Sequence, residues 1–369
     1  MRQILFTIPL NTWISSLPNI PIYGYGLMLF TAYILCTALG KRLCKRDGID
    51  PKVIPDLTIW LFVAGIIGAR AVFVIEYWDR FSGDYGTILR LWDGGLVFYG
   101  GVIGGAIGYF GYDYFVLRKL NISKWKMIDV VAPCIILGSA LGRIGCLFTG
   151  CCYGNVACES CPALHFPIDA PASTDMLRRG NQTQYGFLFD GETLRVAAVE
   201  AGSTAAAAGL ERGDIIVKIN GTPAHSQNLD RYGTPPLTLT VLRNGAETTL
   251  PPFELASIGV HPTQIYESIS MVLLLMFLLS YWPFRRCHGE LMVFAMLGYG
   301  VHRFLNEMLR TDNEVVAFGL TLSQNISLLV IAAAIALAII VYRRPRISDE
   351  PPTPIFDAAP ASDHTSQMS

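Results

Sequence analysis

Three arginines stand inside long apolar stretches of this sequence, where charged side chains are rare. Arg70, Arg143 and Arg303 each lie in a mostly apolar run of about 20 residues. Placing a guanidinium at the centre of a membrane-spanning helix costs at least about 2.5–3.5 kcal/mol, so each arginine needs a partner or a function. A guanidinium stays charged when it is desolvated, and its planar fork of donors matches a phosphate. These arginines therefore favour capture of an anionic lipid phosphate.

Further polar residues fall at the same ends of the apolar stretches, and we expect all of them at one depth in the membrane. They are Tyr25, Glu76, Tyr99, His261, Gln264, Glu267, Glu307, Gln324 and Asn325. Taken singly, each fits an interfacial side chain that is paired or reaches water. Arg303 and Glu307 fit an i,i+4 ion pair, and Arg70 could pair with Glu76 or stabilise a bend. Taken together, they predict a polar cavity near one membrane face.

Seven apolar stretches predict the elements that position these residues. They cover about 23–40, 56–78, 95–116, 127–149, 263–284, 289–308 and 320–342. About 20 apolar residues in a helix cross the hydrocarbon layer, and a helix satisfies its backbone groups internally. Glycines at three- and four-residue spacing, such as Gly100, Gly104 and Gly108, let neighbouring helices approach closely. The predicted fold class is an all-α polytopic membrane protein with seven transmembrane helices.

The composition agrees with a membrane protein. Apolar residues make up 52% of the 369 residues and charged residues 15%, and the mean hydropathy is +0.41. Soluble domains carry about 25% charged residues, so an ordinary soluble enzyme and a disordered chain are excluded. The net charge of −1 gives no basic field for nucleic acid, so we expect no nucleic-acid partner.

The distribution of basic residues predicts the orientation of the spans. The segments after spans 1, 3, 5 and 7 contain fourteen: Lys41, Arg42, Lys45, Arg46, Lys52, Arg118, Lys119, Lys124, Lys126, Arg285, Arg286, Arg343, Arg344 and Arg346. The short segments on the other side contain four: Arg2, Arg80, Arg90 and Arg310. Basic residues favour the cytoplasmic side, so we expect the N-terminus and segment 150–260 outside and the C-terminus inside. The first 20 residues lack a long apolar core, so no signal peptide is predicted.

Motifs in these stretches resemble those of bacterial prolipoprotein diacylglyceryl transferases. Gly142-Arg143-Ile144-Gly145, followed by Gly150 and Gly154, is similar to the family signature. Other segments match in order: residues 25–28, 68–70 and 95–101, Asp129 and Pro133, residues 261–267, Tyr299, Arg303-Phe304, Glu307, residues 310–312 and Ser323-Gln324. The similarity covers about 20–154 and 258–342.

The resemblance implies a reaction and roles for individual residues. The family moves a diacylglyceryl group from phosphatidylglycerol to the thiol of a lipobox cysteine and releases glycerol phosphate, without a metal or organic cofactor. On this template the expected catalytic residues are Arg143, Arg303, Tyr25, Tyr99, Tyr299 and Glu307. The expected substrate-binding residues are Arg70, His261, Gln264, Glu267 and Gln324. The implied location is the bacterial inner membrane, with membrane lipid and an acceptor protein as partners.

This sequence departs from the family motifs at several positions. Tyr99 stands where the family usually has a histidine. Four further residues replace the asparagine and carboxylate of the signature: Cys146, Thr149, Cys151 and Cys152. Attack by sulfur requires a thiolate, and tyrosine, with a pKa of about 10, is a poor base, so His261 and His302 are substitute candidates. Two alternatives stay open: a phospholipid-dependent transferase with a different acceptor, and a non-catalytic lipid-binding scaffold.

Five of the nine cysteines cluster in residues 146–161. On the expected outer side, one or two disulfides are the first interpretation. A zinc site is the second, because Cys158 and Cys161 have C-x2-C spacing. A reactive thiol in the cavity is the third.

Residues 181–253 change character, with more charged and turn residues and alternating strands around 194–199, 214–219 and 237–242. Residues 202–221, with a tight turn expected at Asn220-Gly221, resemble bacterial PDZ domains. The resemblance implies a periplasmic module whose residues Gly186, Phe187 and Leu188 bind a peptide, and a spacer without a ligand is the alternative.

The expected domains follow from these segments. They are a membrane domain in two parts, 1–154 and 254–344, a cysteine-containing linker 155–180, the PDZ-like domain 181–253 and a disordered cytoplasmic tail 345–369.

Overall fold

The computed structural model describes most of the chain and divides it into two compact units. The described residues are 4–8, 20–81, 85–90, 95, 97–158, 160–167, 170–178, 183, 186–190, 193–224, 236–254, 257–310 and 315–349. Unit 1 comprises Met1–Leu29, Gly142–Ile269 and Arg303–Gln324, and unit 2 comprises Phe30–Leu141, Ser270–His302 and Asn325–Ser369. Most of the helical length belongs to unit 2.

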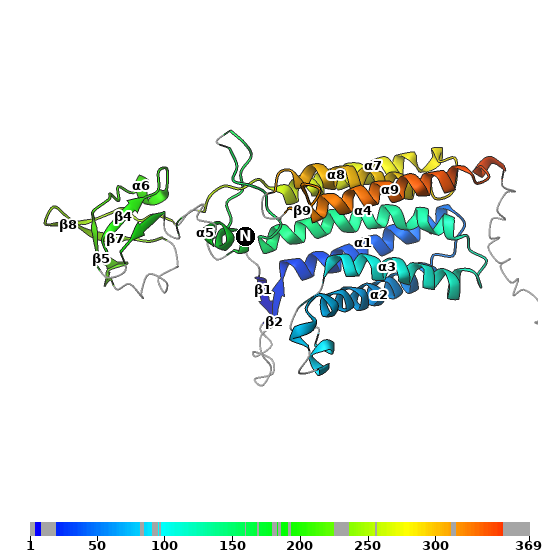
Figure 1. Cartoon of the computed structure of the whole chain (residues 1–369), viewed down its shortest axis with the longest axis horizontal. Helices are drawn as coiled ribbons and strands as arrows, with labels where there is room; N and C mark the ends of the chain where they lie inside the picture. Colours follow the sequence, from blue (N-terminus) through cyan, green and yellow to red (C-terminus); the bar gives the residue numbers. More distant parts are fainter. Residues whose placement is uncertain are drawn as a thin grey trace, which may run out of the picture. The chain divides into compact units, whose positions relative to one another are not determined.

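Long helices form at every apolar stretch of the sequence. They are α1 (Gly24–Arg46), α2 (Val53–Glu76), α3 (Phe98–Tyr112), α4 (Lys124–Thr149), α7 (Thr263–Tyr281), α8 (Glu290–Glu307) and α9 (Leu322–Tyr342). Within unit 2 these helices lie side by side (Figure 1). Short helical turns follow four of them: Trp78–Arg80, Asp113–Leu117, Trp282–Phe284 and Ile347–Asp349. A further turn, Tyr85–Leu89, precedes α3.

Among the described residues, five helices are long and apolar enough to cross a membrane. These are Gly24–Arg46, Val53–Glu76, Lys124–Thr149, Thr263–Phe284 and Leu322–Tyr342. The other two predicted spans form α3, with 15 residues, and α8, with 18 residues and charges at both ends. A mainly helical polytopic membrane protein is therefore confirmed, while crossing by α3 and α8 stays a prediction.

Glycines bring α2 and α3 into direct backbone contact. A Cβ atom added at Gly68 would lie 2.4 Å from the carbonyl oxygen of Gly100 and 2.7 Å from the Cα of Gly104. A Cβ at Gly104 would lie 2.4 Å from the carbonyl oxygen of Ala64. The close approach expected from the glycine spacing is thus confirmed.

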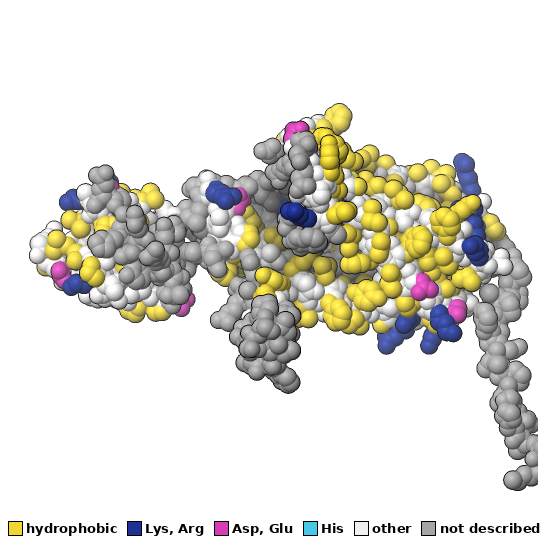
Figure 2. Space-filling model, turned by 90° about the horizontal axis from the view of Figure 1, so that it is seen from below, with side chains coloured by type: hydrophobic (Ala, Val, Ile, Leu, Met, Phe, Trp, Pro, Cys, Tyr) yellow, Lys and Arg dark blue, Asp and Glu magenta, His cyan; other side chains and the backbone are white. Residues whose placement is uncertain are grey.

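The basic ends of the helices meet in unit 2. Arg285, after α7, binds Asp47, after α1, with Nη2 2.6 Å from Oδ2. Arg344, after α9, stacks on Trp125 at the start of α4, with the guanidinium carbon 4.6 Å from the ring centroid. Figure 2 shows basic side chains gathered at one end of the apolar helical surface. The sequence predicts that the basic segments lie on the same side of the membrane, and the helix ends that carry Arg285 and Arg344 lie at one end of the helices.

The inserted segment of unit 1 forms small antiparallel sheets with their own core. A four-stranded sheet has the order β6-β5-β7-β8, from Thr222–Pro223, Ile215–Ile219, Leu239–Arg243 and Ala246–Thr249. A second sheet pairs β3 (Phe187–Phe189) with β4 (Val196–Val199), and a short helix α6 spans Thr204–Ala207. Phe187, Val196, Ile219 and Leu239 are buried together in this core. The three expected strands are confirmed.

The expected turn at Asn220-Gly221 is also present. Both residues have positive φ, 48° and 82°, and they join β5 to β6. A two-residue hairpin turn of this kind needs left-handed backbone at both positions, which Asn and Gly tolerate. Asn244-Gly245, with φ of 51° and 83°, repeats this turn between β7 and β8.

The remaining elements are short. Strands β1 (Ile4–Ile8) and β2 (Ile20–Tyr23) pair before α1, strands β9 (Val315–Ala317) and β10 (Leu320–Thr321) pair before α9, and helix α5 spans Pro171–Arg178. Most of the tail predicted to be disordered, from residue 350 onward, lies outside the described residues.

Candidate active site

Two arginines and two glutamates form an ion-pair cluster in unit 1. Arg143 of α4 binds Glu267 of α7, with Nε 2.9 Å from Oε1. Arg303 of α8 lies 3.8 Å from the other oxygen of Glu267 and 2.9 Å from Oε2 of Glu307. Three helices thus contribute to one charged cluster, and the sequence expectation that Arg143, Arg303, Glu267 and Glu307 lie together is met.

The carboxylates of this cluster are buried, whereas the arginine side chains remain partly exposed. The Glu267 and Glu307 side chains are 2% and 0% exposed, and those of Arg143 and Arg303 are 18% and 12% exposed. A buried carboxylate needs a cationic or hydrogen-bonding partner. The glutamates therefore fix the arginines from the protein side, and the Nη1 atom of Arg303 is buried without a hydrogen-bond partner among the described residues.

Neutral polar side chains hold the carboxylates in place. Asn306 Nδ2 donates to Glu267 Oε2 at 3.2 Å, and Thr321 Oγ1 donates to Glu307 Oε1 at 3.2 Å. Arg303 Nη2 donates to Ser323 Oγ at 2.9 Å, and Gln324 Oε1 accepts the backbone N–H of Thr321 at 3.0 Å. The sequence pattern does not distinguish Asn306 and Thr321, because neutral amides and hydroxyls are common near helix ends and have no special spacing here.

The loop after α4 is fastened to the start of α7. Gln264 Nε2 donates to the carbonyl of Cys151 at 2.7 Å, and Thr263 Oγ1 donates to that of Cys152 at 2.7 Å. A Cβ at Gly154 would lie 2.8 Å from the Cβ of His261, so only glycine fits this approach. The Nδ1 atom of His261 is buried and has no hydrogen-bond partner among the described residues.

Tyr25, at the start of α1, belongs to the same unit. A Cβ at Gly145 would lie 2.9 Å from the Cδ2 atom of the Tyr25 ring, so the tyrosine packs against the glycine that follows the arginine motif. Tyr25 is 43% exposed. Its position beside α4 agrees with its expected membership of the site.

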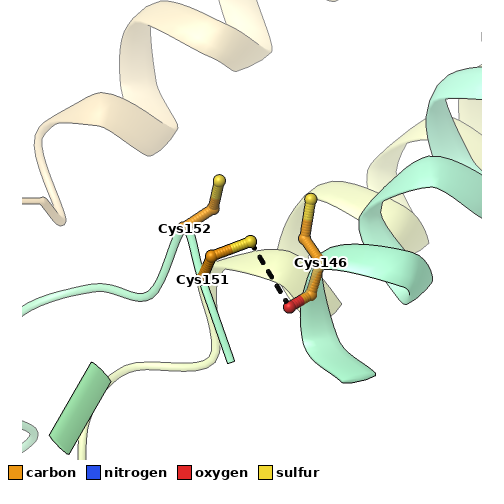
Figure 3. A group of neighbouring side chains, drawn as sticks. All are labelled: Cys146, Cys151 and Cys152. Atoms are coloured by element: carbon orange, nitrogen blue, oxygen red, sulfur yellow. Dashed lines mark hydrogen bonds between the residues drawn. The ribbon is translucent and has the colours of Figure 1, made fainter. Parts of the chain in front are cut away.

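Three free thiols lie beside the cluster. The sulfur atoms of Cys146, Cys151 and Cys152 are all within 4.8 Å of one another (Figure 3). Hydrogen bonds from the Cys146 and Cys151 thiols, with the positive charges of Arg143 and Arg310, lower the pKa of Cys152. The same hydrogen bonding raises the pKa of Cys151. Cys152 is therefore the thiol of this group that ionises first.

One disulfide forms in the outer cysteine group, between Cys158 and Cys161. The first interpretation of these cysteines, one or two disulfides, is therefore confirmed for this pair. The alternative of a zinc site at the C-x2-C pair is wrong, since both sulfurs are already bonded to each other.

Comparison with known proteins identifies the family of this chain. The family model described as prolipoprotein diacylglyceryl transferase matches residues 12–340. The chain belongs to this family. A relative from Rhodopirellula baltica is 30% identical over 384 aligned positions, which cover 92% of this chain and 77% of the relative. One from Finegoldia magna is 26% identical over 337 positions, covering 91% and 97%. Both are named phosphatidylglycerol–prolipoprotein diacylglyceryl transferase, so the expected family and enzyme class are confirmed.

Among the remaining family-motif residues, Tyr99, Tyr299 and Arg70 lie in unit 2, as does the substitute base candidate His302. Arg70 Nη2 donates to the carbonyls of Thr87 and Arg90 at 2.7 and 3.2 Å. Its Nε and Nη1 donate to the carbonyls of Ile88 and Gly95 at 2.8 and 3.0 Å. These contacts favour the alternative that Arg70 stabilises the bend after α2, and substrate binding by Arg70 stays a prediction.

The three residues expected to bind a peptide have different environments in this diacylglyceryl transferase family member. Gly186 has φ of +78°, and a Cβ there would lie 2.9 Å from the Cβ of Ser203. Phe187 is fully buried in the core of the inserted sheets, whereas Leu188 is 54% exposed. Substituting Phe187 would disturb the fold, so Leu188 is the position that can report on peptide binding.

Proposed function

We propose that the Arg143–Glu267–Arg303–Glu307 cluster binds the phosphate of phosphatidylglycerol while the diacylglyceryl group passes to the thiol of a prolipoprotein cysteine. The observation that carries this proposal is that Glu267, a buried carboxylate, contacts two arginines whose side chains are partly exposed. A preorganised guanidinium group can donate two parallel hydrogen bonds to two oxygens of a phosphodiester. Family membership supplies the reaction class, and the cluster supplies the phosphate site.

The reaction is a displacement at carbon. The acceptor sulfur attacks the glycerol carbon of the diacylglyceryl group, a C–S bond forms, and the C–O bond to phosphate breaks. The electron pair of that bond stays on the phosphate oxygen, and glycerol phosphate leaves. Arg143 and Arg303 stabilise the charge that develops on the leaving phosphate, which is where preorganised donors accelerate a reaction most.

The carboxylates orient the arginines without using up their donors. A guanidinium carries five N–H donors, so an ion pair to one carboxylate leaves part of the fork for an anion. The glutamates also balance the charge of the cluster, so that the two arginines are stable in a low-dielectric site before lipid arrives. The incoming phosphodiester then adds one negative charge beside the two arginines.

The thiol proton needs an acceptor, and His261 is the best placed candidate in unit 1. It precedes α7 and packs beside Gly154, and its buried Nδ1 has no hydrogen-bond partner among the described residues. A neutral imidazole nitrogen can accept a proton near neutral pH. A His261→Gln variant should lose transfer at pH 7 and regain part of it at higher pH, where more acceptor thiolate forms. An unchanged pH–rate profile for that variant would exclude His261 as the base.

The orientation proposed for this site is the outer face of the inner membrane. Helix α4 begins at Lys124, among the clustered basic residues, and carries Arg143 near its other end. Basic ends favour the cytoplasm, so Arg143 then lies at the opposite, periplasmic leaflet. Seven spans, an outside N-terminus and a periplasmic inserted domain follow from the same assignment.

The inserted domain is proposed to bind an extended peptide of the acceptor, as PDZ-like modules do. Strand β3 pairs with β4, and Leu188 projects from β3 to the surface. An exposed strand edge can accept a further strand, whose alternate side chains give specificity. A Leu188→Arg variant should raise the KM for the acceptor and leave the KM for phosphatidylglycerol unchanged. Equal acceptor KM values in variant and wild type would support the spacer alternative.

Purified protein in phosphatidylglycerol vesicles tests the whole proposal. A lipobox peptide should gain the mass of a diacylglyceryl group on its cysteine, with one glycerol phosphate released for each peptide modified. A peptide whose cysteine is replaced by serine is the matched control and should stay unmodified. No mass increase on the cysteine peptide would contradict the proposal.

A further inference from the structure

The loop after α4 brings together three thiols that neither the ion-pair cluster nor the transfer reaction requires. Cys146 lies in the last turn of α4, and Cys151 and Cys152 follow it directly in the loop. Figure 3 shows the thiol of Cys151 directed toward Cys146, with Cys152 beside it. All three sulfurs are within 4.8 Å of one another, and none of them is in a disulfide.

These separations are close to those of a metal bound by three thiolates. With Zn–S bonds of about 2.3 Å, sulfur ligands lie about 3.8 Å apart in tetrahedral geometry and about 4.0 Å apart in a trigonal plane. The measured upper limit of 4.8 Å therefore requires only a small contraction. Thiolate ligands select soft or borderline cations such as Zn²⁺ over Mg²⁺ or Ca²⁺.

The backbone conformation lets the neighbouring thiols of Cys151 and Cys152 both lie near Cys146. Consecutive side chains of an extended chain point to opposite sides. Cys152 instead has φ of +59°, a left-handed conformation that few residues other than glycine adopt. The hydrogen bonds from Thr263 to the Cys152 carbonyl and from Gln264 to the Cys151 carbonyl fasten this turn to α7.

The charges around the thiols suit a thiolate site. Three thiolates and one Zn²⁺ carry a net charge of −1, and the partly buried position of the site favours a nearby positive charge. Arg143 and Arg310 are close enough to Cys152 to interact with it electrostatically. Binding forms three metal–sulfur bonds and releases to solvent the protons that the thiols still carry.

We propose that Cys146, Cys151 and Cys152 form a three-thiolate site for a zinc-like d¹⁰ cation at the rim of the lipid site. A fourth coordination position is left for water. The cation would fasten the loop that follows Arg143 to the end of α4. Its three metal ligands are not residues of the proposed phosphate cluster, so its occupancy can be measured without lipid substrate.

Titration of the reduced, full-length protein in detergent with Cd²⁺ tests the proposal. The wild type should bind one equivalent and develop an ultraviolet sulfur-to-cadmium charge-transfer band. Cys151→Ser and Cys152→Ser should each weaken binding by more than the 10–100-fold, or about 1.4–2.8 kcal/mol, that loss of an outer-sphere partner costs. Cys134→Ser, on the same helix as Cys146, is the matched control and should bind like the wild type.

Alkylation of the wild type provides a second readout that does not depend on folding of the serine variants. Saturating Zn²⁺ should protect Cys146, Cys151 and Cys152 from alkylation, as mapped by peptide mass spectrometry. The absence of a charge-transfer band, a band retained in both serine variants, or equal alkylation with and without Zn²⁺ would overturn the proposal. None of these results depends on transferase activity, so the two proposals can fail separately.

Discussion

At the scale of single residues, Glu267 links the two arginines on which the proposed chemistry depends. Its two oxygens face Arg143 and Arg303 at 2.9 and 3.8 Å, and Asn306 donates to the second oxygen. Breaking a buried ion pair by removing one partner costs about 3–5 kcal/mol, because the remaining charge is left uncompensated. Glu267 thus determines both the position of the arginines and the stability of the site.

A Glu267→Gln variant tests this role. We expect kcat/KM for diacylglyceryl transfer to fall at least about tenfold, or about 1.4 kcal/mol, because the arginine forks lose their common anchor. Glu247→Gln is the matched control, since Glu247 forms an exposed ion pair with Lys218, 3.0 Å away, in the inserted sheet. Both are assayed for transfer to a lipobox peptide. Equal rates in the Glu267 variant and the wild type would show that the arginines do not depend on this carboxylate.

The sequence was sufficient to predict the charged members of the site but not all of their partners. A charged residue inside an apolar run is conspicuous, so Arg143, Arg303 and Glu267 could be recognised. The partners of Arg70 are backbone carbonyls, and carbonyls leave no signal in a sequence. The disulfide between Cys158 and Cys161 also could not be distinguished from a metal site, because their C-x2-C spacing is compatible with both.

At the scale of elements, the apolar runs predicted the helices well because helix length is set by the membrane. The first span, predicted to end near residue 40, extends to Arg46, since long basic side chains can reach water from the last turn and favour a helix C-terminus. The third is shorter than predicted and passes into a π-helical turn at Asp113–Leu117. Hydropathy cannot indicate such a change of helical pitch.

The contact between α2 and α3 gives a second prediction. A Gly68→Ala variant should lower the melting temperature in detergent, because its methyl group would meet the backbone of Gly100 and Gly104 at 2.4–2.9 Å. Overpacking of this kind typically costs about 1–3 kcal/mol. Gly105→Ala is the matched control, since a Cβ there has nothing within 4 Å. If both alanine variants melt at the wild-type temperature, the close helix contact is not required for stability.

The inserted sheets contain an ion pair between buried Asp214 and partly exposed Arg243, and its effect on stability depends on pH. Asp214 accepts hydrogen bonds from Arg243 at 2.6 and 2.8 Å. Burial raises the pKa of Asp214, but these hydrogen bonds outweigh it and lower the pKa below its usual value. The lowered pKa means that the pair stabilises the fold above about pH 4 and that this contribution disappears as the pH falls through the folded-state pKa.

Hydrogen exchange in the full-length protein measures this effect. Amides of β5 and β7 should lose protection below about pH 4, after correction for the intrinsic exchange rate. In an Asp214→Asn variant the same amides should be less protected at pH 7, by about 1.5–3 kcal/mol, and should show a weaker pH dependence. Amides of α9 are the internal reference and should not change. If protection in the Asp214→Asn variant depends on pH as in the wild type, a group other than Asp214 causes the pH dependence.

At the scale of the whole molecule, the inserted segment leaves and rejoins the membrane part at nearly the same place. The backbone N–H of Gly154 donates to the carbonyl of His261 at 2.9 Å, and that of His261 donates to the carbonyl of Asn155 at 2.8 Å. Val156 and Val260 then form an isolated bridge. Both ends of the excursion are therefore paired to each other, and the site residues do not depend on the inserted sheets for their spacing.

A deletion of residues 181–253 tests this independence. With a short Gly-Ser linker in their place, the protein should retain transfer, because the flanking segments remain paired and each ion pair of the cluster lies outside the deletion. The KM for the acceptor should rise if the inserted domain binds the acceptor, while the KM for phosphatidylglycerol should stay constant. If a deletion variant that still inserts and folds loses transfer completely, the site depends on the inserted domain.

Steady-state kinetics of Arg143→Lys and Arg303→Lys in phosphatidylglycerol vesicles test most directly whether these two arginines hold the phosphate of the lipid during transfer. Lysine keeps the charge but loses the planar fork, so kcat should fall by about 10²–10³ in each variant, as when one preorganised donor is removed from a developing anion. Arg344→Lys, at the basic ends of the helices, should behave like the wild type. Wild-type kcat in both Arg143→Lys and Arg303→Lys would contradict the account.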